Sequence, residues 1–159
     1  MKKLKRIIAV VLAISISIGI LTMTVSAAEA DPEITAHLMS EEETIQLLYR
    51  TRMAETGTVY LPRNNATGIN GNPCGAFTAD KTNVSFAIKA GVPGATNFNV
   101  QLYVGELGNG FKAADYARVP IGLGVTFYDL VVGKDYYFMV SSDTVSGQGA
   151  TATYTFETF

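Results

Sequence analysis

Cysteine and histidine are nearly missing from this chain, and tryptophan is missing altogether. Cys74 is the one cysteine among 159 residues, so no intrachain disulfide can form and a hydrophobic core must hold the fold together. His37 is the one histidine, which excludes a metal site built from several imidazoles or thiolates of one chain. A nucleophile activated by histidine would also depend on His37, and no obvious nucleophile accompanies it.

Other signatures of catalysis and cofactor binding are absent as well. No glycine-rich loop ends in Lys-Ser/Thr or opens a helix, so a phosphate-cradling loop is not indicated. Asp129 and Asp135 flank an expected turn, and Glu106 and Asp115 lie in an expected loop without the repeated acidic spacing of a calcium site. No basic cluster exists, so nucleic acid is not expected as a partner. The sequence therefore predicts a protein that is not an enzyme and holds no cofactor or metal.

The first 27 residues have the pattern of a secretory signal peptide. Basic residues precede an apolar run that starts at Ile7, and the small residues Val25-Ser26-Ala27 follow it. We predict cleavage after Ala27, with Ala30 as a second candidate, and a protein that is secreted or held at the cell surface. The alternative is an uncleaved anchor, because residues 7–25 are just long enough to span a bilayer. Membrane contact is expected only in that case.

Residues 28–57 are acidic and are predicted to be helical. The signal segment holds four of the 12 basic residues and none of the 14 acidic ones, so the remaining chain has a net charge of −6, most of it in this segment. Ser40 followed by three glutamates is a capping-box signature, which predicts a helix near Glu41–Glu55. Ile45 and Leu48 would pack this helix on the edge of a β-sandwich. A partly ordered tether and a partner-binding helix are the alternatives.

Residues 58–159 are predicted to form an all-β antiparallel sandwich, since turn residues recur about every ten positions. Apolar and polar residues alternate clearly in Asn83–Lys89, Phe98–Val104 and Asp135–Ser142. Further strands are expected at 58–61, 76–78, 119–128 and 151–158, and loops at 63–75 and 105–117. Cys74 lies near the first of these loops, where we expect a buried thiol; an exposed thiol that forms a disulfide dimer is the alternative.

One stretch, from Leu130 to Val140, organises this part of the chain. Gly133 and the polar pair after it mark a turn, and Tyr136 is the first core-facing residue of the strand that follows. The buried hydroxyl of Tyr136 needs a partner, and the backbone of the preceding turn is close by. Such an arrangement is a tyrosine corner. The spacing of Leu130, Gly133 and Tyr136 resembles the corner between strands E and F of fibronectin type III domains.

This resemblance implies an identity for five strands over about 80 residues. Asn83–Lys89 looks like strand B and Phe98–Val104 like strand C. Leu123–Tyr128 looks like strand E, Asp135–Ser142 like F and Thr151–Glu157 like G. The chain departs from the family because strand B has no tryptophan, and Phe86 is the residue available to fill that place. A generic immunoglobulin-like or carbohydrate-binding sandwich therefore stays open.

Three tyrosines, Tyr103, Tyr128 and Tyr137, are predicted to face away from the core. A row of exposed aromatic rings is what a sugar-binding face needs for stacking. The alternative is that they form ordinary cross-strand pairs or are covered by the N-terminal helix.

We therefore expect an exported, non-catalytic adhesion, interaction or spacer module with a protein or a cell-surface polysaccharide as its partner. A small carbohydrate-binding module that uses the three tyrosines is the alternative. A self-associating surface protein is a third hypothesis, because the weakly charged sandwich would favour pairing between strand edges.

Overall fold

The computed structural model divides the chain into two units, Met1–Ala30 and Asp31–Phe159. The first unit, and with it the expected signal peptide, lies outside the residues that the structure describes. Those residues are 33–50, 54–62, 71–89, 94–114, 116–143 and 150–159.

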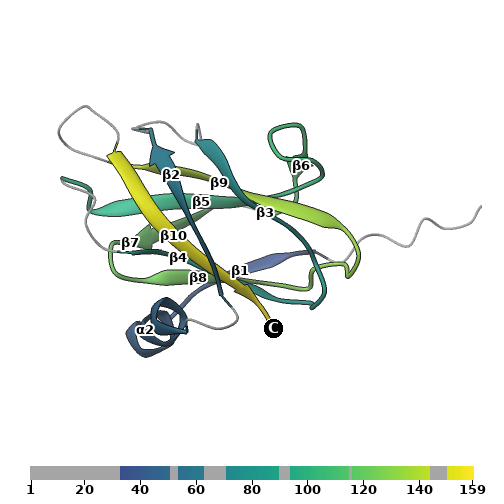
Figure 1. The fold of residues 1–159 in the computed structure, drawn as a ribbon, viewed down its shortest axis with the longest axis horizontal. Coiled ribbons are helices and arrows are strands. Elements are labelled where there is room, and N and C mark those ends of the chain that lie inside the picture. Colours follow the sequence, from purple (N-terminus) through teal and green to yellow (C-terminus); the bar gives the residue numbers. More distant parts are fainter. Residues whose placement is uncertain (1–32, 51–53, 63–70, 90–93, 115, 144–149) are drawn as a thin grey trace, which may run out of the picture. The chain divides into compact units, whose positions relative to one another are not determined.

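The second unit is an all-β sandwich of two antiparallel sheets, as the sequence predicts (Figure 1). Sheet A has the strand order β1 (Thr35–Leu38), β8 (Gly124–Tyr128), β4 (Val84–Lys89), β10 (Ala150–Thr158), β2 (Glu55–Leu61). Sheet B has the order β3 (Asn72–Thr78), β9 (Asp135–Ser142), β5 (Asn97–Val104), β6 (Phe111–Lys112), and β7 (Ala117–Pro120) also pairs with β5. The predicted strands β4, β5, β9 and β10 are present within one residue of their expected bounds.

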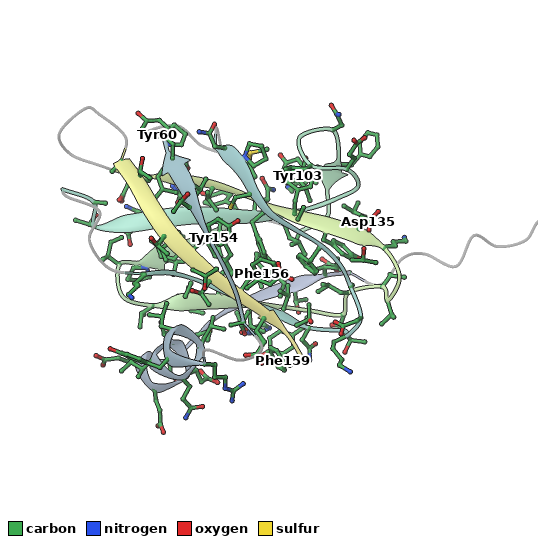
Figure 2. All side chains as sticks on the ribbon, viewed as in Figure 1. Tyr60, Tyr103, Asp135, Tyr154, Phe156 and Phe159 are labelled. Carbon is green, nitrogen blue, oxygen red and sulfur yellow. The ribbon has the colours of Figure 1, made fainter. Side chains whose placement is uncertain are left out.

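Aromatic rings fill the space between the two sheets. Phe86 of β4 is fully buried and its ring centroid lies 4.4 Å from that of Phe138 on β9. Tyr154 and Phe156, which lie one after the other along β10 in Figure 2, contact Phe86 and Phe138 respectively. Each such ring removes about 150–250 Å² of surface from water, so this cluster supplies the core that a chain without disulfides needs.

The prediction of one continuous strand over residues 119–128 is wrong. Pro120 ends β7 in sheet B and Gly124 begins β8 in sheet A, so this stretch passes from one sheet to the other. Gly122 turns the backbone with φ = +92°, a conformation that favours glycine. The apolar residues on both sides of the turn conceal it in the sequence.

Three other expectations about loops and strands are corrected. The predicted loop 63–75 ends earlier, because β3 begins at Asn72; residues 63–70 lie outside the described part of the chain. The predicted loop 105–117 contains the two-residue strand β6. β1 was not expected at all, since all four of its residues are exposed and its sequence shows no alternation.

The helix α2 (Glu41–Tyr49) is shorter than expected, and Glu55 belongs to β2 instead. Its start is as predicted: the Ser40 hydroxyl accepts from the backbone N–H of Glu43, and the Glu43 carboxylate accepts from the N–H of Ser40. It packs on the outer face of sheet A and not on an edge, through Thr44 and Leu47. Of the two residues expected to pack, Leu48 is partly buried against this face, whereas Ile45 is 48% exposed.

The last strand occupies an unexpected place. In the immunoglobulin-type order, strand G lies beside strand F. β10 instead pairs with β4 and β2 in sheet A, and β3 takes the place beside β9 in sheet B. The sequence could not show this exchange, because either sheet accepts a strand with apolar residues on one face.

Candidate functional site

The three tyrosines that sequence reasoning placed on one ligand face do not share a face. Tyr103 and Tyr137 are cross-strand neighbours on the outer face of sheet B, with ring centroids 5.3 Å apart. Tyr137 is only 1% exposed, and its hydroxyl accepts a hydrogen bond from the backbone N–H of Gly110. Tyr128 lies in sheet A and packs edge-on against His37. The expectation of one exposed row is therefore wrong, and Tyr128 lines a cavity beside α2.

The turn before β9 holds a tyrosine corner. Tyr136 is buried, and its hydroxyl accepts a hydrogen bond of 3.0 Å from the backbone N–H of Val131. Leu130 is buried in the same core, and Gly133 turns the chain with φ = +87°. These contacts fix the path of the chain from sheet A to sheet B, so the corner has a structural role.

One side of the sandwich is open, and β1 lies along it. Ala36 and Leu38 are paired with Phe127 and Val125, which face the core, so their side chains point between the sheets. β1 approaches β7 of sheet B, but both side chains stay exposed, and Leu38 is 54% exposed. The inward face of β1 is therefore accessible.

The backbone of β1 has a free side as well. The N–H of Met39 donates to the carbonyl of Gly124 at the start of β8. Backbone groups alternate in direction along an antiparallel strand, so those of Ala36 and Leu38 point away from β8. Among the described residues no strand pairs with this side of β1, so the same two residues present open backbone groups and inward side chains.

A groove, here called the edge groove, runs between β1 and the segment that carries β6 and β7. Its volume is about 670 Å³, and small or apolar side chains form much of its wall. The apolar members are Ile34, Ala36, Leu38, Ala113, Ala114, Tyr116 and Ala117. A second hollow of about 350 Å³ shares Glu33, Ile34, Lys112 and Ala113 with it and extends it toward Val131 and Lys134.

The opposite side of the sandwich is closed. The side-chain amide of Asn72 on β3 donates to the carbonyl of Tyr60 on β2, at 3.1 Å. The backbone N–H of Ser142 on β9 donates to the carbonyl of Pro62, at 2.9 Å. Pro73 and a register shift after Cys74 further protect the edge of β3. The edge strand β1 and the groove beside it therefore lie on the same, open side of the sandwich.

A second, polar cavity lies beside α2 on the outer face of sheet A. Thr126, Ser85 and Glu157 stand side by side across β8, β4 and β10, and all three are buried. α2 covers the neighbouring row, where Met39 and Leu47 pack on Ala87. The cavity between helix and sheet, here called the helix pocket, has a volume of about 250 Å³.

The helix pocket contains an ion pair in which only the carboxylate is buried. The carboxylate of Glu157 has 7% of its side-chain surface exposed, and it accepts from the Arg50 guanidinium at 3.3 Å. Arg50 follows the last residue of α2 and is itself 58% exposed in its side chain. Beside this pair, the hydroxyls of Ser85 and Thr126 are joined by a hydrogen bond of 2.8 Å. Sequence reasoning missed this site, because its residues come from four elements and match no motif.

Cys74 is free and buried, as the sequence interpretation favoured. Burial raises the pKa of its thiol to about 12, because the thiolate would have to form away from water. Such a thiol is a poor nucleophile at neutral pH and lies out of reach of another chain.

The described residues contain neither a candidate metal site nor a candidate membrane span. No group of three or more His, Cys, Asp and Glu side chains in them is placed to hold a metal ion. In the same part of the chain, no helix has the length and apolar character needed to cross a bilayer.

Comparison with known proteins gives no relative. No family model, no curated protein and no solved structure matches the chain. Function must therefore be inferred from the edge groove and the helix pocket themselves.

Proposed function

We propose that this chain is an exported, non-catalytic interaction module that binds a partner protein by strand addition at β1. The supporting observation is that Ala36 and Leu38 present both backbone groups and inward side chains at a free sheet edge. An extended polypeptide beside β1 would join the ladder of sheet A, and its alternate side chains would enter the edge groove. Strand addition draws affinity from backbone hydrogen bonds and specificity from such alternate pockets.

The wall of the edge groove indicates what the bound segment contains. Ala113, Ala114 and Ala117 leave room for apolar side chains at alternate positions. We therefore expect the bound segment to be extended, with apolar side chains at every second position.

Export is part of the proposal and is supported by the signal-peptide pattern of residues 1–27. Because the chain has one cysteine, it forms no intrachain disulfide, and the hydrophobic core holds the sandwich together.

An immunoglobulin-like or fibronectin type III-like origin for the sandwich is also proposed. Its support is the pairing of β4 with β8 and of β5 with β9, which matches the B–E and C–F pairs of such domains. The tyrosine corner is a second likeness. The exchange of β3 and β10 between the sheets is the main difference.

A library of extended peptides with apolar residues at alternate positions, displayed on phage, tests the proposal. Selected peptides should bind the wild-type protein and lose about tenfold or more in affinity against Leu38→Asp, since a charge would enter the groove. Ala36→Pro should weaken binding similarly. It removes an N–H that points away from β8, so the β1–β8 pairing is retained.

Tyr60→Asp is the matched control, because Tyr60 is 48% exposed on β2 at the other edge of sheet A. It should leave peptide affinity unchanged. A library that yields no binder, or binders that tolerate both β1 variants, would contradict the proposal. A dimer in sedimentation that Ala36→Pro dissociates would assign the edge to a second copy and overturn the choice of partner.

A further inference from the structure

The helix pocket has a different chemistry from the edge groove, and the two share no lining residue. Its lining combines a buried carboxylate, hydroxyls, an amide, a guanidinium and two aromatic rings, from Glu157, Ser85, Thr126, Gln46, Arg50, Tyr128 and Phe159. We propose that this pocket binds one ring of a neutral sugar. This is a second binding site, independent of strand addition at β1.

Glu157 gives the first reason. A carboxylate offers about four acceptor positions, and within the described residues this one accepts a single hydrogen bond, from Arg50. Removing a carboxylate from water is costly unless its acceptor positions are filled. A ligand that brings several hydroxyl donors would fill them. The neighbouring hydroxyls of Ser85 and Thr126 add both donors and acceptors along the same row.

The charges around the pocket favour a ligand without charge. Arg50 compensates Glu157 directly. The other lining carboxylate, Glu43, is bound by the N–H and hydroxyl of Ser40 at the start of α2, which lowers its pKa. A ligand cation would meet the Arg50 guanidinium, and a ligand anion would meet two carboxylates. A neutral polyol avoids both penalties.

Size and shape give the third reason. Cavities for drug-sized ligands measure about 300–1,000 Å³, so a pocket of about 250 Å³ suits a single sugar ring. Tyr128 and Phe159 come from β8 and from the residue after β10, and both line the pocket. Sugar rings present apolar C–H faces that pack on aromatic side chains, while their hydroxyls reach polar groups beside them. The pocket offers both kinds of partner.

Protein-observed NMR of the purified, isotope-labelled protein is the test. The probes are methyl glycosides of glucose, galactose, mannose and N-acetylglucosamine, with glucosamine and glucuronic acid as charged counterparts. At least one neutral glycoside should bind and should shift the signals of Ser85 and Thr126. Glu157→Gln and Tyr128→Ala should each weaken that binding about tenfold or more, because each removes a direct ligand contact.

Two further variants make the result decisive. Ser85→Ala removes a pocket hydroxyl while keeping the Arg50–Glu157 pair, so it reports on binding even where Glu157→Gln disturbs the fold. Glu42→Gln removes an exposed charge of α2 that does not line the pocket, and it should bind like wild type. Absence of binding by every neutral glycoside overturns the proposal. So does tighter binding of a charged probe, or binding that the three pocket variants leave unchanged.

Discussion

Tyr136 shows how one hydroxyl can determine the path of a chain between two sheets. Its ring is part of the core, while its hydroxyl accepts from the Val131 N–H five residues earlier. A buried N–H without a partner costs free energy, so the turn is stable only in the conformation that reaches this oxygen. The corner is local, which is why the spacing of Leu130, Gly133 and Tyr136 could predict it from the sequence.

Tyr136→Phe keeps the ring and removes the hydroxyl. The Val131 N–H then loses its acceptor, so we expect a decrease of about 1–3 kcal/mol in the free energy of unfolding, measured by urea denaturation. Tyr60→Phe is the control, since Tyr60 lies half-exposed on β2, and it should change stability by less than about 0.5 kcal/mol. Equal stability of both variants would show that the hydrogen bond contributes nothing net.

The burial of Tyr137, the next residue, could not be predicted from the sequence. Its alternation correctly places it on the outer face of β9, away from the core. It is buried nonetheless, because the chain near Gly110 returns over it and donates to its hydroxyl. The covering segment is 27 positions away in the sequence. Contacts of that range leave no periodic signal.

At the scale of the element, Thr44 forms the hydrogen bond that joins the body of α2 to sheet A. The Thr44 side chain is fully buried, and its hydroxyl accepts from the N–H of Gly124 at 2.9 Å and donates to the carbonyl of Ser40. Leu47 adds the apolar contact beside it. The helix forms one wall of the helix pocket, so its attachment is a condition for that site.

Thr44→Val tests this attachment with a side chain of nearly the same shape. The Gly124 N–H would lose its acceptor, and we expect a loss of about 1–3 kcal/mol in unfolding free energy. Amide exchange should rise most in α2 and at the start of β8. Thr151→Val, at an exposed position of β10, is the matched control and should alter neither quantity. Uniformly faster exchange throughout the sandwich would argue against a local role.

The elements differ in how far the sequence predicts them. β4, β5, β9 and β10 could be predicted because each has a face in the core and therefore alternates. β1 could not, since an open groove leaves its inward residues as exposed as its outward ones. The face of α2 that meets the sheet was predicted from Ile45 and Leu48. The structure buries Thr44 and Leu47 and partly buries Leu48 beside them, whereas Ile45 is exposed. The helix pocket depends on the register of three strands, which no single segment encodes.

At the scale of the whole molecule, Asp143 connects the ends of three strands. Its carboxylate accepts from the backbone N–H of Asn97 at 2.6 Å, from the Arg118 guanidinium at 2.8 Å and from the hydroxyl of Thr96. Burial raises its pKa, but the hydrogen bonds from Arg118, Asn97 and Thr96 outweigh burial and lower it to about 2. The charged form is therefore favoured by folding.

This pKa predicts an acid-dependent stability. A carboxyl with a lowered folded-state pKa stabilises the fold above its ordinary value of 3.8, and this contribution is lost as the pH falls through about 2. The shift corresponds to about 2 kcal/mol. Urea unfolding between pH 2 and pH 6 should show the decline, and Asp143→Asn should flatten it. An unchanged acid slope in that variant would place the sensitivity in other carboxyls.

The position of β10 has a consequence for how the chain is made. The strand latest in the sequence lies between β4 and β2, so β2 has no neighbour in sheet A until residues 150–158 are available. A chain synthesised from its N-terminus can pair β4 with β8 early, but it cannot complete this sheet before its final strand has emerged. For the exported protein proposed above, sheet A would stay incomplete until its last strand has been synthesised.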